Sequence, residues 1–169
     1  MLPLKGGCHT SRREQVETPF EVAVIRKNQS DPRKDASSPL QAAQLRPIGV
    51  IRSTLKNLEK APMQGSEGAP DAWLEVNAFA REALEGLHPG DQIIVITWLH
   101  QSDRDLLKVH PRSDPNRPLT GVFATRSPDR PNPLGLHPVT IRRIVGSRLQ
   151  VGPIEAIDGT PVVDIKPML

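Results

Sequence analysis

The sequence predicts a mostly-β protein, in which a single β-barrel-like domain of short strands with one short helix follows an N-terminal extension. Hydrophobic residues make up 37% of the 169 residues and aromatic residues only 3%. Val, Ile and Leu must therefore build the core, and the β-branched members of that set favour strands. Eighteen Pro and 12 Gly divide the chain into many short elements. Apolar runs of strand length recur without the strand–helix alternation of a parallel α/β sheet.

The composition divides the chain into an extension, residues 1–44, and a barrel domain, residues 45–169. Residues 26–38 (RKNQSDPRKDASS) are polar and charged, so they cannot bury surface and are expected to be partly disordered. Residues 20–25 (FEVAVI) are a candidate edge strand within the extension. Cys8 also falls in the extension, where we interpret it as an incidental thiol. A single Cys excludes both an internal disulfide and a zinc site built from cysteines.

The barrel strands are predicted from short apolar segments bounded by turn residues. They are Ile48–Ser53, Ala72–Val76, Gln92–Leu99, Gly121–Ala124, Val139–Val145, Arg148–Val151 and Val162–Ile165. The run Gln92–Leu99 (QIIVITWL) is apolar throughout, which predicts a central strand buried on both faces.

A short helix is predicted over residues 78–87. Asn77 stands at a capping position, and the face expected to be buried carries Phe79, Ala83 and Leu87. Residues 101–120 are expected to form an irregular loop. Loops of that length in compact domains are usually functional or disordered.

The positive charge of the chain is concentrated in one segment. The formal net charge is only +3, but residues 101–148 carry nine Lys and Arg against four Asp, an excess of five. Eight of the nine are Arg, whose planar fork binds phosphate and carboxylate groups. The segment therefore predicts an anion-binding surface for phosphate or nucleic acid. No apolar run approaches the length of a membrane span and no signal peptide is visible, so a cytoplasmic location is expected.

The most informative segment is residues 121–138, GVFATRSPDRPNPLGLHP. Prolines at positions 128, 131, 133 and 138 restrict the backbone, so the loop Thr125–Pro138 loses little entropy when a ligand binds. We expect Gly135 to supply a backbone angle that other residues resist. Such a rigid loop would hold Arg126 and Arg130 in reproducible positions.

This segment closely resembles the signature of the TrmO, or TsaA-like, family of S-adenosylmethionine-dependent tRNA methyltransferases. Three further matches follow in the expected order: IGVIRS at 48–53, WLHQ at 98–101 and DGTPVVDIKP at 158–167. The resemblance covers residues 46–169, corresponding to the short form without an extra C-terminal domain. It implies a β-barrel homodimer that methylates N6 of N6-threonylcarbamoyladenosine next to the anticodon of tRNA. Two positions depart from the usual pattern, Leu134 in place of Ile and His137 in place of Ser.

The resemblance also implies which residues bind S-adenosyl-L-methionine. Arg126 is the expected partner of the cofactor's carboxylate, because a charged fork suits a carboxylate best. The other implied cofactor residues are Pro62, Met63, Gln64, Gly65, His100, Gln101, Leu136, His137, Asp158, Gly159, Thr160 and Pro161. Leu136, with the neighbouring His137, is expected to contact the adenine end.

Two further sets of residues are assigned from chemistry. The acceptor nitrogen needs a group that takes its proton, and the candidates are His100, Asp158 and Asp164, among which the sequence does not choose. Asp164 is alternatively an anchor for Lys166. The expected tRNA-binding residues are Arg104, Lys108, Arg112, Arg117, Arg130, Arg142 and Arg143, with Arg130 alternatively bracing its loop.

Other functions remain open at this point. The same methyl chemistry on another RNA or on a small molecule is one alternative, and a non-catalytic RNA-binding β-barrel is a second. A metal-dependent hydrolase is the third, since ligand-type residues occur in and beside the loops. These are His100, Asp103, Asp105, His110 and His137, but their spacing matches no standard metal motif, so no metal is expected.

Overall fold

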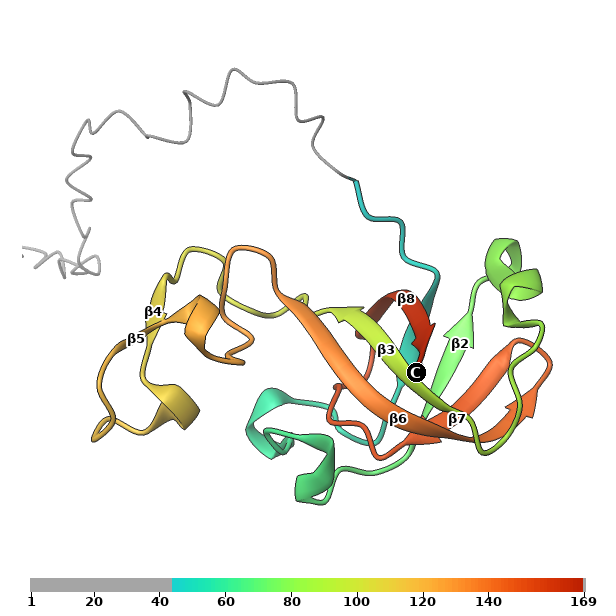
Figure 1. Ribbon diagram of the computed structural model, residues 1–169, viewed down its shortest axis with the longest axis horizontal. Helices are drawn as coiled ribbons and strands as arrows, with labels where there is room; N and C mark the ends of the chain where they lie inside the picture. Colours follow the sequence, from blue (N-terminus) through green and yellow to red (C-terminus); the bar gives the residue numbers. More distant parts are fainter. Residues whose placement is uncertain (1–43, 169) are drawn as a thin grey trace, which may run out of the picture. The chain divides into compact units, whose positions relative to one another are not determined.

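Six strands form a closed antiparallel barrel in the computed structural model, which describes residues 44–168 (Figure 1). The neighbours run in the order β1-β2-β7-β6-β3-β8, and β8 pairs back onto β1. The strands are β1 (Gly49–Arg52), β2 (Ala72–Val76), β3 (Gln92–Trp98), β6 (Leu134–Val145), β7 (Arg148–Gly152) and β8 (Pro161–Pro167). The predicted fold class is confirmed. The extension falls almost entirely within residues 1–43, outside the described residues, and so do the candidate edge strand and Cys8.

The long segment between β3 and β6 is more ordered than the predicted loop. It contains a two-stranded antiparallel sheet of β4 (Lys108–Val109) and β5 (Thr120–Gly121), drawn at the left of Figure 1. Short 3-10 helices occupy the remaining connections. They are η2 (Leu58–Lys60), η3 (Gly65–Glu67), η4 (Ala78–Leu84), η5 (Pro111–Ser113) and η6 (Val122–Ala124).

Aliphatic side chains fill the barrel, as the composition predicts. Alternate residues of each strand point inward, and the fully buried side chains include Ile51, Leu74, Val95 and Leu149. Each such side chain removed from water contributes about 1.5–3 kcal/mol of transfer free energy. The barrel therefore provides a rigid frame on which the loops at its ends are mounted.

The central strand β3 is buried on one face only, so the prediction of burial on both faces is wrong. Ile93, Val95 and Thr97 point into the barrel, whereas Ile94 and Ile96 are half-buried on its outside. A barrel has one interior, and only the inner face of a strand is covered by it. The outer face of β3 is therefore a partly exposed apolar surface that a partner could cover.

The predicted strand Gly121–Ala124 is also wrong. Only Gly121 belongs to a strand, and Val122–Ala124 form η6. The Val122 carbonyl accepts bonds from the Thr125 amide at 3.0 Å, the Thr125 hydroxyl at 3.0 Å and the Arg130 guanidinium at 3.1 Å. A carbonyl engaged in this way cannot take part in a strand ladder, so local polar contacts override the apolar pattern.

The predicted helix exists as the 3-10 helix η4, but it is shorter, and of the three residues expected to be buried only Leu87 packs against the core. Asn77 does not cap it, because its amide donates to the Pro47 carbonyl at 3.1 Å. The tighter winding turns Ala80 and Leu84 toward the core and leaves Phe79 exposed. Between residues 44 and 168, no helix combines the length and the apolar character needed to cross a membrane.

Candidate functional site

Three of the predicted site segments meet at one end of the barrel. Thr97, near the end of β3, pairs with Gly135 at the start of β6 and with Val162 at the start of β8. Residues 100–101 directly follow β3, the loop 125–133 leads into β6, and the turn 158–160 leads into β8. The antiparallel register therefore places these segments around one rim, which we call the β3–β6–β8 rim.

The fourth segment, residues 62–65, reaches the same region through Gly65. A Cβ atom on Gly65 would lie 2.8 Å from the Pro153 carbonyl oxygen and 3.3 Å from Oε2 of Glu155. Glu155 in turn contacts β6, because its Oε1 lies 2.9 Å from Nδ1 of His137. The structure thus brings the glycine end of this loop against the residues that line the start of β6.

A hydrogen-bonded chain of three polar side chains lies behind the rim. His137 is 3% exposed and points into the barrel. Its Nδ1 is 2.9 Å from the Glu155 carboxylate, and its Nε2 is 2.9 Å from the Thr97 hydroxyl. An ionised carboxylate only accepts hydrogen bonds, so Nδ1–H donates to Glu155 and, in the neutral ring, Nε2 accepts from Thr97. The buried imidazole is satisfied at both nitrogens, and it fixes one oxygen of Glu155.

Glu155 remains ionised in this setting. Burial raises its pKa, but the hydrogen bond from His137, the electrostatic influence of that ring, the Glu155 backbone amide and the charge of Arg126 together lower the pKa below its usual value. Sequence reasoning missed Glu155. The available signal was the inward alternation of β6, which makes His137 a buried imidazole in need of a polar partner.

Arg126 is exposed in the loop before β6, and no side-chain hydrogen bond or ion pair holds it within residues 44–168. Its charge contributes to the low pKa of Glu155, so the guanidinium acts on the same region as the carboxylate. The donors of the Arg126 guanidinium are thus available to a ligand, and its positive charge acts on the Glu155 carboxylate. This pairing fits a zwitterion.

Arg130 braces the loop. Its Nε donates to the Ser127 carbonyl at 2.7 Å, and its Nη2 donates to the carbonyls of Thr125 at 2.7 Å and Val122 at 3.1 Å. The alternative role considered for this residue, bracing rather than facing RNA, is the one these contacts serve. The backbone of this loop is therefore restricted by its prolines and also held by the half-buried guanidinium of Arg130.

Replacing Arg130 by alanine is expected to destabilise the protein by about 1.5–3 kcal/mol, because three carbonyls lose a charged donor. Arg126→Ala is the matched control, since that side chain bonds to no described residue, and it should leave the free energy of unfolding nearly unchanged. Urea denaturation of both variants measures the difference. Equal stability of the two variants would contradict a bracing role.

The turn before β8 is held by its own contacts. Asp158 accepts a hydrogen bond from the Ser53 amide at 2.9 Å and pairs with Lys56 at 2.9 Å. The hydrogen bond from Lys56, followed by that from Ser53, lowers the pKa of Asp158 despite some desolvation. The Thr160 hydroxyl is buried and donates to the Ile157 carbonyl at 2.8 Å. Asp158 is consequently a weak base.

The other candidate bases differ in their surroundings. Asp164 lies 2.8 Å from Lys166, which is the anchoring contact considered as an alternative for it. His100 is exposed just beyond β3, with its Nε2 3.5 Å from the Gln101 amide nitrogen. Of the three candidates, His100 is the one without a strong ion pair among the described residues.

Leu136 and His137 lie on opposite sides of β6. Leu136 is 49% exposed on the outside of the barrel, where it pairs across the sheet with Ile96, whose other neighbour is Asp164. A ligand on that outer surface would touch Leu136 without reaching the buried ring of His137.

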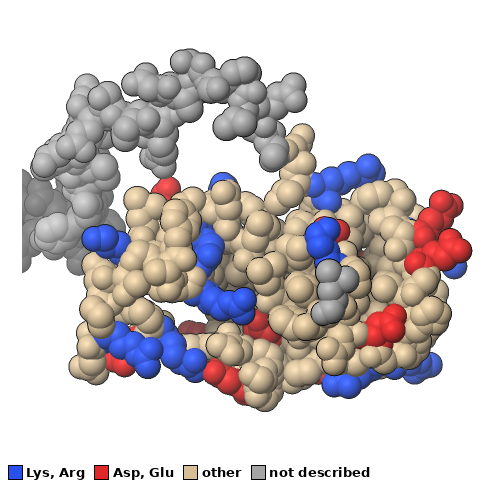
Figure 2. All heavy atoms as spheres, viewed as in Figure 1, with Lys and Arg blue, Asp and Glu red and all other residues tan. Residues whose placement is uncertain are grey.

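Some of the predicted tRNA-binding cations contact other side chains or carbonyls of the protein, and others have no such partner. Arg112 pairs with Glu67 at 2.6 Å, Arg117 with Asp114 at 3.5 Å and Arg142 with Asp71 at 3.8 Å, while Arg104 lies over the Trp98 ring at 5.2 Å and bonds to the Pro131 carbonyl. Lys108 and Arg143 are exposed, with no such partner within residues 44–168. Figure 2 shows basic side chains over the part of the molecule that carries β4 and β5.

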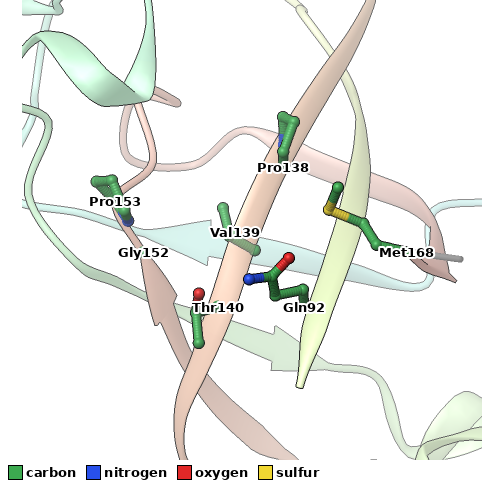
Figure 3. A pocket seen from close by; sticks show the side chains of 7 residues that line it. All are labelled: Gln92, Pro138, Val139, Thr140, Gly152, Pro153 and Met168. Carbon is green, nitrogen blue, oxygen red and sulfur yellow. The ribbon is translucent and has the colours of Figure 1, made fainter. Parts of the chain in front are cut away.

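Two pockets open beside Gln92, at the start of β3, and Met168. A pocket of about 220 Å³ is lined by Gln92, Pro138, Val139, Thr140, Gly152, Pro153 and Met168 (Figure 3). Gln92 begins β3, whereas the rim lies where that strand ends. None of the predicted site residues lines this pocket, and we attach no function to it. Among residues 44–168, no three His, Cys, Asp or Glu side chains gather in a way that could hold a metal ion.

Comparison with known proteins identifies relatives of the whole barrel. A probable S-adenosyl-L-methionine-binding protein of Methanocaldococcus jannaschii is 52% identical over 128 residues, which cover 72% of this chain and 89% of that protein. A protein of the same description from Pyrococcus horikoshii is 44% identical, covering 75% and 82% respectively. The crystal structure of TrmO from Pseudomonas aeruginosa superimposes with a TM-score of 0.61 at 34% identity.

That alignment covers 77% of this chain and 57% of the TrmO chain, so the present chain spans little more than half of the solved structure. The family model described as the tRNA-methyltransferase O N-terminal domain matches residues 50–169. The match includes every segment of the β3–β6–β8 rim. The chain therefore belongs to the family of the TrmO N-terminal domain.

Proposed function

We propose that this protein is an S-adenosyl-L-methionine-dependent methyltransferase that methylates N6 of N6-threonylcarbamoyladenosine next to the anticodon in tRNA. Its relatives are named for binding this cofactor, and the solved structures it resembles are TrmO. The observation that carries the proposal is the exposed guanidinium of Arg126, which bonds to no described residue, at a rim where His137 also fixes the part-exposed carboxylate of Glu155. Together they match the carboxylate and ammonium groups of the cofactor's methionine end.

Methyl transfer depends more on aligning the methyl donor with the acceptor nitrogen than on a strong acid or base. S-adenosyl-L-methionine supplies a methyl group on a sulfonium centre, and in-line transfer to N6 breaks the C–S bond, forms the N–C bond and leaves the electron pair on sulfur. Holding the methyl donor and the acceptor nitrogen in line lowers the activation free energy by several kcal/mol. Arg126 orients the methionine end, and the remaining loops of the rim exclude water.

The proton on the acceptor nitrogen must leave as the new bond forms. His100 is our proposed acceptor of that proton, since it is exposed at the rim and Asp158 and Asp164 each hold a lysine. An imidazole is suited to proton transfer near neutral pH. The lowered pKa of Asp158 makes that carboxylate a weaker base.

The tRNA would bind through the exposed cations of the segment between β3 and β7. For each phosphate contact, the logarithm of the affinity falls by roughly one unit when the logarithm of the salt concentration rises by one unit. Lys108→Ala is expected to weaken tRNA binding and to reduce the slope of log affinity against log salt by about one, because that ammonium has no competing partner in the described part of the chain. Arg81→Ala, on η4, is the control and should leave the slope unchanged. Filter-binding titrations from 50 to 200 mM salt provide the measurement, and a slope unaffected by Lys108→Ala would remove this residue from the interface.

We further propose a homodimer in the cytoplasm, where its tRNA substrate resides. Apolar side chains are exposed on two surfaces. One surface, near β4 and β5, carries Leu107 and Phe123, and Phe123 is 82% exposed. The other, on the outside of β6, carries Leu134 and Leu136. Exposed apolar area of this kind marks interaction surfaces. Sedimentation of the purified chain tests the assembly.

The function is tested on tRNA from cells with and without the gene. Mass spectrometry of the nucleosides should show the methylated form of threonylcarbamoyladenosine lost on deletion, and purified protein with S-adenosyl-L-methionine should restore it in vitro. If the tRNA nucleosides are the same with and without the gene, but the protein methylates another RNA or a small molecule, the proposed substrate is wrong and the proposed methyltransferase activity is retained. If the wild-type protein does not bind the cofactor, the enzymatic proposal fails, and the chain is an RNA-binding barrel.

A further inference from the structure

The carboxylate of Glu155 is held by His137 at one oxygen and is not fully buried. Oε1 is fixed by the imidazole, whereas Oε2 lies on the side of Gly65, where a Cβ atom would come within 3.3 Å of it. The side chain keeps 23% of its surface exposed. One oxygen is therefore held from inside the barrel, and the carboxylate as a whole stays within reach of a molecule at the rim.

Gly65, at the end of the 62–65 loop, lies close to Pro153 and to the Glu155 carboxylate. With the Pro153 carbonyl only 2.8 Å from the Cβ position, position 65 has no room for a side chain. No side chain at position 65 can therefore serve as a partner for Oε2 of Glu155. An ionised carboxylate also accepts hydrogen bonds only, so a donor is required.

We propose that Glu155 binds the α-ammonium group of S-adenosyl-L-methionine, while His137 and Thr97 are positioning residues that hold the carboxylate for this contact. The inference rests on the proposed cofactor site, where Arg126 takes the neighbouring α-carboxylate. An α-amino acid carries both charges on one carbon, so a cation and an anion standing near each other recognise it better than either does alone. The alternative task for Glu155, accepting a proton in catalysis, is disfavoured because its pKa is lowered, which makes the carboxylate a weak base.

His137 has a defined part in this arrangement. A carboxylate at the end of a flexible glutamate side chain pays entropy when it binds a ligand, and a fixed hydrogen bond reduces that cost beforehand. Gly135 permits the hydrogen bond from the other side, since a Cβ atom there would lie 2.5 Å from both His137 Nε2 and Thr97 Oγ1. His137 is thus packed and hydrogen-bonded with its neighbours on both sides.

The experiment compares three compounds by titration calorimetry on the full-length protein: S-adenosyl-L-methionine, S-adenosylhomocysteine and 5′-methylthioadenosine. The first two carry the ammonium group, and the third lacks the whole amino-acid end. Glu155→Gln is expected to weaken the first two by the same factor, about 10- to 100-fold, and to leave 5′-methylthioadenosine unchanged. Glu85→Gln, an exposed glutamate at the end of η4, is the control and should bind all three as wild type does.

The positioning role has its own readout. His137→Ser should weaken S-adenosylhomocysteine several-fold, and in the Glu155→Gln background it should add nothing further, because it acts through that carboxylate. If Glu155→Gln melts below the assay temperature, Glu155→Asp replaces it, and its shortened carboxylate should produce the same selective loss. Unchanged affinity for S-adenosylhomocysteine, a loss restricted to the sulfonium compound, or an equal loss for 5′-methylthioadenosine would each overturn the inference. Failure of the wild-type protein to bind any of the three would instead reject the proposed function.

Discussion

Replacing Arg126 by alanine is expected to raise the dissociation constant for S-adenosyl-L-methionine by about 10- to 150-fold. The guanidinium would donate charge-assisted hydrogen bonds to the cofactor's carboxylate, each worth about 1.5–3 kcal/mol. Because the side chain holds no other described residue, the loss should appear in binding and not in the free energy of unfolding. Titration calorimetry and urea denaturation of the same sample separate the two.

Arg126→Lys is the informative companion variant. It keeps the charge but loses the planar fork, so it should recover only part of the affinity. Affinity for 5′-methylthioadenosine, which has no carboxylate, should be the same for wild type and both variants. If Arg126→Ala bound the cofactor as tightly as wild type, the assignment of the carboxylate to this loop would be wrong.

Gly135→Ala is expected to destabilise the protein by about 2–4 kcal/mol. A Cβ atom would stand 2.5 Å from His137 Nε2 and from Thr97 Oγ1, and 3.1 Å from Leu99 Cδ2, in the packed end of the barrel. Relieving that overlap costs about 1–3 kcal/mol, and separating the imidazole from its hydroxyl partner adds the cost of a buried group left unsatisfied.

Gly121→Ala is the matched control for this substitution. Gly121 belongs to the same sequence motif, its Cβ position has no described atom within 4 Å, and its φ is not positive. The control should therefore unfold at nearly the wild-type urea concentration, while Gly135→Ala unfolds at a clearly lower one. Equal midpoints for the two alanine variants would show that the barrel end accommodates the added methyl group.

Gly135 also shows where sequence reasoning identified a residue for the wrong reason. The expectation was a backbone angle that only glycine adopts easily, yet Gly135 lies in β6 and is not among the glycines of positive φ. What requires glycine is the space that His137 and Thr97 occupy. That requirement comes from the pairing of β6 with β3, two strands separated by 35 residues, and no local pattern contains it.

Most strands could be predicted because alternation and turn residues are local signals. Ala72–Val76 was predicted with its observed bounds, and β1, β3 and β7 within one residue at each end. The strand β6 begins five residues earlier than predicted, within the proline-rich motif, because Leu134–Pro138 pair with β3 despite the proline. Pairing across the sheet supplies that part of the strand, and the sequence alone does not display it.

The candidate site divides in the same way. Motif residues such as Arg126 and the turn at Asp158 stand out in the sequence, and the barrel register gathers their segments at one rim. Glu155 does not stand out, because a single glutamate in a loop is ordinary until His137 is known to lie buried beside it. The engagement of Arg130 with three carbonyls was likewise open until its contacts were known.

The central claim is that the β3–β6–β8 rim binds the methionine end of S-adenosyl-L-methionine through Arg126. A crystal structure of the protein with the cofactor tests this most directly. The account predicts the α-carboxylate within hydrogen-bonding distance of the Arg126 guanidinium and the α-ammonium next to Glu155. A cofactor bound instead in the pocket beside Gln92 and Met168, without contact to Arg126, would contradict it.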